Sequence, residues 1–308
     1  MSRAWVIALL LAGCYRPAPS PGAPCPDGDC PSGQRCVAGT CRADGDPTLD
    51  AEVGSDAALD APDAATDPLG IWSAPVLIPG VNSNANETDP SITADLLAIV
   101  FASNRPGGLG SDDIYLGTRA STAAPFTVAA ITAINSPMRD RSPEISPDGN
   151  TIYFTSNRGG DYDVYASVRS GGVWSAPQPV AVLSSAANEG DVAISPDGLT
   201  ALVERSEDLY LATRPSLGAA FDPPVLVPVL DVTGDVASPS LTDDAASVYL
   251  HGGGTRDLYV AYRQGNTFTV PVRIPELTTG DRDAAPFISP DGKHLVFERD
   301  GDLYETSR

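Results

Sequence analysis

The chain has few of the side chains from which most enzyme active sites are built. Its 308 residues include two histidines, His251 and His294, and no Gly-x-Ser-x-Gly motif of the kind that presents a catalytic serine. All five cysteines lie within the first 41 residues, so the rest of the chain lacks a thiol nucleophile. The sequence shows no catalytic constellation, metal site or cofactor motif, and it predicts a non-catalytic protein.

Basic residues are also scarce. The chain has 19 Lys and Arg residues against 40 Asp and Glu residues, which gives a net charge of −21 at neutral pH. Proteins that bind nucleic acid or anionic lipid heads present basic surfaces to them. We therefore expect no nucleic-acid partner and no direct docking on lipid head groups.

Long hydrophobic runs are absent outside the N-terminus. The run from Ala4 to Leu11 is too short to span a bilayer as a helix, and it leads into the tetrapeptide Leu11-Ala-Gly-Cys14. This pattern predicts a signal peptide over residues 1–13. The tetrapeptide resembles the bacterial lipobox, which implies cleavage before Cys14 and lipidation of that cysteine. The alternative is an ordinary secretory signal with an incidental cysteine.

Lipidation would make residues 14–24 a tether. Several acyl chains on one cysteine would supply the multiple anchors that stable membrane attachment requires. By the rule for Gram-negative lipoproteins, a residue other than aspartate after the cysteine directs the protein to the outer membrane, and Tyr15 is such a residue. We expect an outer-membrane lipoprotein that faces the periplasm and contacts the membrane only through its lipid, with exposure at the cell surface as the alternative.

A short cysteine-rich segment follows, over residues 25–41. Four cysteines within 17 residues of an exported chain predict two disulfides, and the sequence leaves all three connectivities open. A zinc site is the alternative, although the segment has no Cys-x-x-Cys pair. We interpret the segment as a cross-linked spacer, with a small recognition module as the other possibility. The cysteines are Cys25, Cys30, Cys36 and Cys41.

Residues 42–70 have the composition of a disordered linker. The segment contains eight acidic residues, one arginine and no aromatic residue, so it cannot bury enough apolar surface to fold. Repulsion between its acids would extend it. We expect it to hold the following domain away from the membrane.

Five related stretches fill residues 71–308. Each contains a tight turn such as Ser146-Pro-Asp-Gly149, followed by an Asp-(Ile/Val/Leu)-Tyr-x-x-x-Arg strand such as Asp163–Arg169. Successive copies of that aspartate lie 50, 45, 49 and 45 residues apart, a period typical of propeller blades. The copies are Asp113, Asp163, Asp208, Asp257 and Asp302.

One unit predicts four antiparallel strands. Apolar residues on both sides of the Ser146–Gly149 turn indicate a hairpin of an inner and a central strand. The third strand is Asp163–Arg169, and the proline-containing segment Val173–Val182 suits an outer edge, where no ladder hydrogen bond is needed. Four strands per period match one blade of a β-propeller.

The two ends of the repeat region predict how the ring closes. An outer-type strand, Ile71–Ile78, precedes the first inner strand, whereas the chain stops at Arg308 after a third strand. The early strand can complete the last blade and leave no open sheet edge. We therefore predict an all-β, five-bladed propeller of four-stranded antiparallel blades over residues 71–308, closed by its N-terminal outer strand.

These motifs resemble the TolB-type β-propeller repeat. The resemblance rests on the Ser-Pro-Asp-Gly turns, on the Tyr153–Arg158 strand and on the Asp-x-Tyr strands, and it covers all five units. It implies a monomeric scaffold that binds a cell-envelope protein or peptide. The alternative is a glycan-binding or glycoside-acting module, because five-bladed propellers also carry glycosidases. The fourth unit departs from the pattern, since His251-Gly-Gly-Gly254 replaces the Ser-Asn-Arg loop.

An acidic residue precedes the inner strand of each blade. Inner strands line the central channel of a propeller, so these acids could form a ring at one mouth and attract a cation or a basic peptide. The alternative is that they cap the loops that enter the inner strands and are solvated. The recurrent third-strand aspartates are interpreted as scaffold. The predicted ring consists of Glu87, Asp140, Glu189, Asp235 (offset by one position) and Asp283.

Overall fold

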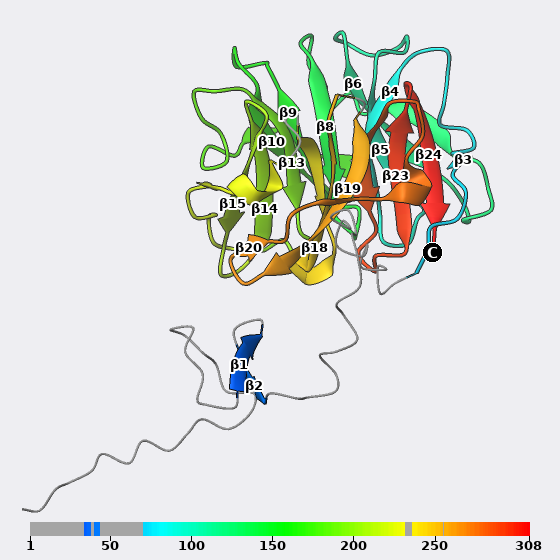
Figure 1. The fold of residues 1–308 in the computed structure, drawn as a ribbon. Helices are drawn as coiled ribbons and strands as arrows, with labels where there is room; N and C mark the ends of the chain where they lie inside the picture. Colours follow the sequence, from blue (N-terminus) through cyan, green and yellow to red (C-terminus); the bar gives the residue numbers. More distant parts are fainter. Residues whose placement is uncertain (1–33, 38–39, 44–69, 232–235, 255) are drawn as a thin grey trace, which may run out of the picture. The chain divides into compact units, whose positions relative to one another are not determined.

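The computed structural model describes residues 34–37, 40–43, 70–231, 236–254 and 256–308 (Figure 1). It divides the chain into two units, residues 1–63 and 64–308. The described part of the first unit is one hairpin, β1 (Gln34–Val37) and β2 (Thr40–Ala43), in which Cys36 and Cys41 are cross-strand partners.

The remaining predictions for the N-terminal region lie outside the described residues. These are the signal peptide, the tether with Cys14, the linker up to residue 69, and the cysteines Cys25 and Cys30. Lipidation and the disulfides therefore stay predictions. No helix among the described residues is long and apolar enough to cross a membrane.

The second unit is all β and contains five antiparallel blades, in agreement with the prediction. The inner strands are β4 (Glu87–Ile92), β8 (Asp140–Ile145), β13 (Glu189–Ile194), β17 (Ala237–Leu241) and β22 (Asp283–Ile288). The second strands are β5 (Ala98–Ser103), β9 (Thr151–Ser156), β14 (Thr200–Arg205), β18 (Ser247–Gly252) and β23 (His294–Arg299). The third strands are β6 (Asp113–Thr118), β10 (Asp163–Ser170), β15 (Asp208–Thr213), β19 (Asp257–Gln264) and β24 (Asp302–Ser307).

The outer strands are short and complete the sheets. They are β7 (Thr127–Ala130), β11 (Val173–Trp174) with β12 (Gln178–Pro179), β16 (Val225–Leu226), β20 (Thr267–Phe268) with β21 (Val272–Arg273), and β3 (Val76–Leu77). The predicted single strand Val173–Val182 is thus wrong in detail, because two separate pairs on β10 replace it. Pro177 and Pro179 lack the N–H groups that a continuous ladder would require.

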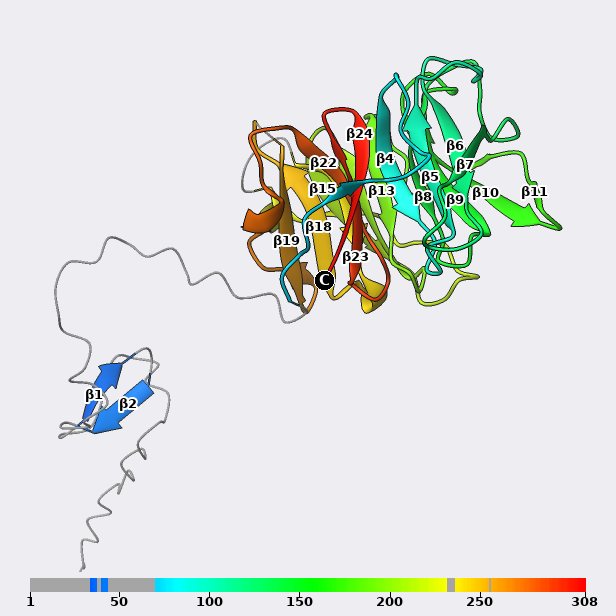
Figure 2. The ribbon, with the colours of Figure 1, turned by 90° about the vertical axis from the view of Figure 1, so that its right-hand side faces the viewer.

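The ring closes as the sequence predicts. Strand β3 pairs with β24, and the partners include Val76 with Glu305 and Leu77 with Tyr304. The inner strand β22 of the last blade contacts β4 of the first, and Figure 2 shows these blades next to each other. The predicted Ile71–Ile78 strand shrinks to two residues, but Trp72 and Ile78 on either side of it are buried.

The core is divided among the interfaces between blades. The buried apolar residues form five clusters, and each cluster combines residues of two neighbouring blades. Each blade is a thin sheet that is apolar on both faces, so it can bury both faces only between two neighbours. The closed ring, and not the single blade, is therefore the unit that is stable.

Two turns depart from the Ser-Pro-Asp-Gly sequence and still keep its backbone geometry. Gly149 and Gly198 take positive φ angles of 73°, and the residues that replace glycine do the same, at 60° for Leu96 and 53° for Ala245. In the fourth blade this turn is the 3₁₀ helix η2 (Asp243–Ala245). Two more 3₁₀ helices, η1 (Pro228–Leu230) and η3 (Pro275–Leu277), follow outer strands.

Candidate functional site

Four of the predicted ring acids lie inside the blades. Glu87, Asp140, Glu189 and Asp283 each begin an inner strand, and all four are 0% exposed. Each accepts a hydrogen bond from a serine or threonine four residues earlier in the incoming loop. The alternative that these acids cap the loops is therefore the observed geometry, but they are buried rather than solvated.

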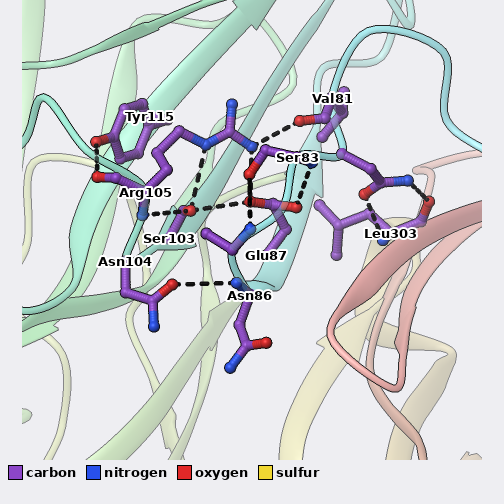
Figure 3. A network of polar contacts seen from close by, with 11 residues as sticks. Val81, Ser83, Asn86, Glu87, Ser103, Asn104, Arg105, Tyr115 and Leu303 are labelled. Atoms are coloured by element: carbon purple, nitrogen blue, oxygen red, sulfur yellow. Dashed lines mark hydrogen bonds and ion pairs between the residues drawn. The ribbon is translucent and has the colours of Figure 1, made fainter.

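Each of the four acids also pairs with an arginine of its own blade. Figure 3 shows the first case, in which Arg105 contacts Glu87 at 2.8 Å and donates to the carbonyl oxygen of Val81 at 2.6 Å. Each such unit consists of an acid, an arginine and a loop carbonyl, and we call it an arginine clamp. The other clamps are Arg158 with Asp140 and Ile134, Arg205 with Glu189 and Leu183, and Arg299 with Asp283 and Leu277.

The clamps determine whether the acids of the predicted ring can bind a cation. A buried carboxylate that is already paired with a guanidinium has no free charge to offer to a cation at the mouth. The expected opening lined by these acids is therefore not what the structure shows, and ligand binding by them stays a prediction. Asp235, the fifth predicted member, lies outside the described residues.

The residues that face the channel lie two positions further along the inner strands. Every inner strand has a register shift next to its third residue, and this bulge turns the third residue toward the axis. Asp89 and Ser142 take positive φ there, at 50° and 49°. These third residues are Asp89, Ser142, Asp191 and Ala285, together with Ser238, which holds the equivalent position although it is the second residue of β17.

The third residues form the floor of a polar cavity at one channel mouth, which we call the mouth cavity. Its volume is about 450 Å³. The walls come from the ends of second strands and from the loops beyond them, and Glu204, His251 and Glu298 occupy equivalent positions on three of those strands. Six acidic residues and four arginines line the cavity, together with one histidine and no Phe, Tyr or Trp among the described residues.

Four acids of the mouth cavity form no ion pair within 4 Å among the described residues: Asp89, Asp191 and Glu204, which are half-buried, and Glu207, which is exposed. Burial, reinforced by the negative charge of Asp191, raises the pKa of Asp89 to about 7 and that of Glu204 to about 7. Arg141 opposes both shifts, and its guanidinium stacks on Tyr162 at 4.3 Å. These carboxyls lack a close cation, so they can bind one.

His251 is the second unusual group of the mouth cavity. It is 3% exposed, and its Nδ1 atom accepts a hydrogen bond from the Ala285 amide at 3.2 Å. Burial and the neighbouring Arg256 and Arg282 lower its pKa to about 3, so the ring is neutral at physiological pH. The Nε2 atom is buried without a hydrogen-bond partner in the described structure.

A narrow passage and a second cavity lie further along the axis. The passage is ringed by Pro90, Pro143, Val192, Pro239 and Pro286. Beyond it, an apolar cavity of about 250 Å³ opens among the Ser-Pro-Asp turns. Glu144, which is 8% exposed, lines both spaces, and burial raises its pKa to about 8.

The remaining sequence motifs have structural roles. Asp113 accepts hydrogen bonds from the Leu109 and Gly110 amides at 2.9 Å, which agrees with the scaffold interpretation of the third-strand aspartates. The third-strand arginines cover buried aromatic rings, as Arg308 covers Trp72 at 4.2 Å. In the described part of the chain, no group of three or more His, Cys, Asp or Glu residues is arranged to hold a metal ion.

The sequence predicted an acidic channel mouth, and the structure places the predicted acids in ion pairs inside the blades while other acids line the mouth cavity. Asp89 and Asp191 follow the predicted Glu87 and Glu189 by two residues, so a carboxylate recurs at this position in two blades. That recurrence was the available signal. The third residue, which the bulge turns inward, is not a glycine, so the sequence pattern did not reveal the bulge.

No family model matches the chain, and no curated protein matches it. Solved structures of similar fold include TolB from Acinetobacter baumannii, with 18% identity and a TM-score of 0.44 over 74% of this chain and 56% of that one. TolB from Agrobacterium tumefaciens has 16% identity and a TM-score of 0.46, over 70% of this chain and 71% of that one.

A family-62 glycoside hydrolase in complex with xylotriose has a comparable likeness, with 10% identity and a TM-score of 0.49 over 77% of this chain and 96% of that one. This chain spans 56% of the length of the A. baumannii protein. Because propellers of unrelated activity are equally similar, nothing about a ligand follows from these likenesses.

Proposed function

We propose that this chain is a non-catalytic binding propeller of the bacterial cell envelope, and that it holds a segment of another envelope protein or a peptide at the mouth cavity. The unpaired acids Asp89, Asp191 and Glu204 carry this proposal. Half-buried carboxylates without a counter-ion cost free energy, and a cationic side chain of a partner would reduce that cost. The lipobox at Cys14 supports attachment to the outer membrane.

The mouth cavity favours a peptide over a sugar. Sugar sites usually offer an aromatic platform, and the described lining has none. The aromatic residues that the sequence places on outer strands are buried under arginines or between blades: Trp72, Trp174, Phe221 and Phe268. The glycan alternative therefore becomes an outcome of the test.

The test is crosslinking from native envelopes with the lipidated protein as bait. The matched variant is Asp89→Asn/Asp191→Asn/Glu204→Gln, which removes the unpaired charge while it retains the shape of the side chains. We expect a specific protein to be captured by the wild type and to be at least tenfold depleted with the variant, because a close charge pair contributes about 1.5 kcal/mol or more. Equal capture by both would contradict the proposal, and capture of cell-wall glycan alone would favour the alternative.

Two further readouts belong to the same experiment. A Cys14→Ser form cannot be lipidated and should leave the membrane fraction; if it stays there, the lipid anchor is wrong. Capture should also strengthen from pH 6 to pH 8. The carboxyls of Asp89 and Glu204 lose their protons over this range, because burial raises the pKa of each to about 7. Asp191 adds to both shifts, Glu298 adds to that of Asp89, and Arg141 opposes both.

A further inference from the structure

The mouth cavity presents two kinds of group from different blades. The acids without ion pairs come from the first and third blades, as Asp89 and the pair Asp191 and Glu204. The fourth blade contributes His251, which feels the positive charges of Arg256 and Arg282. One cavity therefore offers a place for a cation and a separate hydrogen-bonding group.

The hydrogen bond of His251 shows which ring nitrogen carries its proton. Because Nδ1 accepts from the Ala285 amide, and because a neutral imidazole has one donor and one acceptor, Nε2 must be the donor. His251 lines the mouth cavity, and its Nε2–H group is buried and without an acceptor in the described structure. A buried donor without an acceptor costs free energy that an oxygen atom of a ligand would recover.

The position of His251 in the repeat is also unusual. The equivalent residues are Glu204 in the third blade and Glu298 in the fifth, which are hydrogen-bond acceptors when ionised. The next position holds an arginine of a clamp in those blades, and Gly252 in the fourth. At these two positions the fourth blade thus has a donor and a glycine, where the third and fifth blades have an acceptor and an arginine.

We propose that the mouth cavity binds a basic amino-acid residue of the partner segment, with its cationic side chain at Asp89, Asp191 and Glu204 and its own backbone carbonyl accepting a hydrogen bond from His251. This inference rests on the proposed function and adds the class of residue recognised. The volume of about 450 Å³ lies within the range of pockets that enclose small ligands. The proposed ligand class is an organic cation, and in the described part of the chain no group of three or more His, Cys, Asp or Glu residues is arranged to hold a metal ion.

Three small probes separate the two contacts. Nα-acetyl-lysine amide has the cation and the carbonyls, pentylamine has only the cation, and Nα-acetyl-norleucine amide has only the carbonyls. Binding is measured by calorimetry or by NMR titration. In the wild type we expect the lysine probe to bind about tenfold more tightly than pentylamine, since one hydrogen bond accounts for a ratio of that order. The norleucine probe should bind most weakly.

Two variants of His251 form a matched pair. In His251→Asn, the amide oxygen can still accept from Ala285, but no donor reaches the position of Nε2. In His251→Gln, a donor reaches that position while the Ala285 hydrogen bond is lost. We expect the preference for the lysine probe over pentylamine to disappear in the Asn variant and to persist in the Gln variant. Thermal unfolding of both variants verifies that they are folded.

Several outcomes would overturn the inference. One is an unchanged preference in His251→Asn, and another is equal binding of the lysine and norleucine probes. Absence of binding by the lysine probe at a concentration of about 10 mM, where contacts of this size should be detectable, would also overturn it. If envelope capture still depended on the three acids in that case, the proposed function would stand without this ligand class.

Discussion

At the scale of single residues, the buried carboxyl of Glu144 makes the stability of the protein depend on pH. Glu144 is 8% exposed and accepts a hydrogen bond from the Ile194 amide at 3.1 Å. Burial raises its pKa to about 8, and Asp191 adds to the shift. Between pH 4.5 and 8, the folded protein holds a proton here that the unfolded chain has released, so stability falls as the pH rises through this window.

The substitution Glu144→Gln removes this titration while the amide oxygen can still accept from Ile194. We expect the variant to equal the wild type near pH 5 and to exceed its free energy of unfolding at pH 9 by on the order of 3 kcal/mol. Urea unfolding at both pH values measures the difference. Asp89 and Glu204 titrate in both proteins, so their contribution to the pH dependence cancels when the two proteins are compared. A constant gap between the two proteins from pH 5 to 9 would show that Glu144 is not the titrating group.

At the scale of the blade, the arginine clamp ties each inner strand to the loop that enters it. Asp140 is 0% exposed and lies against the Arg158 guanidinium, which stacks on Phe154 at 5.1 Å. Removal of one partner of a buried pair leaves the other charge uncompensated. A clamp should therefore contribute far more to the free energy of unfolding than an ion pair at the surface.

We expect Arg158→Ala to lower the free energy of unfolding by about 3–5 kcal/mol. The control is Arg139→Ala, because Arg139 forms an ion pair with Asp112 with half of its side chain exposed, and such pairs contribute less than about 1 kcal/mol. Chemical denaturation of the two variants compares them directly. Similar losses in both would mean that the clamp contributes no more than a surface pair.

The blade is also the scale at which the sequence was most informative. The Asp-x-Tyr strands and the turns at a fixed period were enough to predict strand number, blade number and the closing strand. The acids at the mouth were harder to assign. Their orientation depends on a bulge that ordinary residues such as Asp89 and Ser142 adopt, and their charge depends on which arginine approaches them in space. Neither property has a local sequence signal.

At the scale of the whole molecule, Trp72 stabilises the closed ring. It is 5% exposed, meets Tyr249 of the fourth blade edge to face at 6.3 Å, and lies under Arg308. Its indole therefore belongs to the interface between the fourth and last blades, although the residue precedes the first blade in sequence. Loss of this side chain would leave a cavity at the seam.

We expect Trp72→Ala to lower the free energy of unfolding by about 3–5 kcal/mol. The seam should then open before the rest of the ring. Hydrogen exchange should then accelerate first in β24. In the control Trp174→Ala, which removes a buried indole of the second blade, β10 should lose protection and β24 should not. Uniform acceleration over all blades in both variants would show that the ring opens only as a whole.

The pairing of β3 with β24 has a consequence for the order of events during synthesis. The hydrogen bonds between Ser73 and Thr306 join residues 233 positions apart, and the last blade has no outer strand until that contact forms. A growing chain can build early blades but cannot seal the seam before residue 307 has emerged. Contacts of such long range form slowly. The ring therefore stays open at this seam until synthesis of the chain is almost complete.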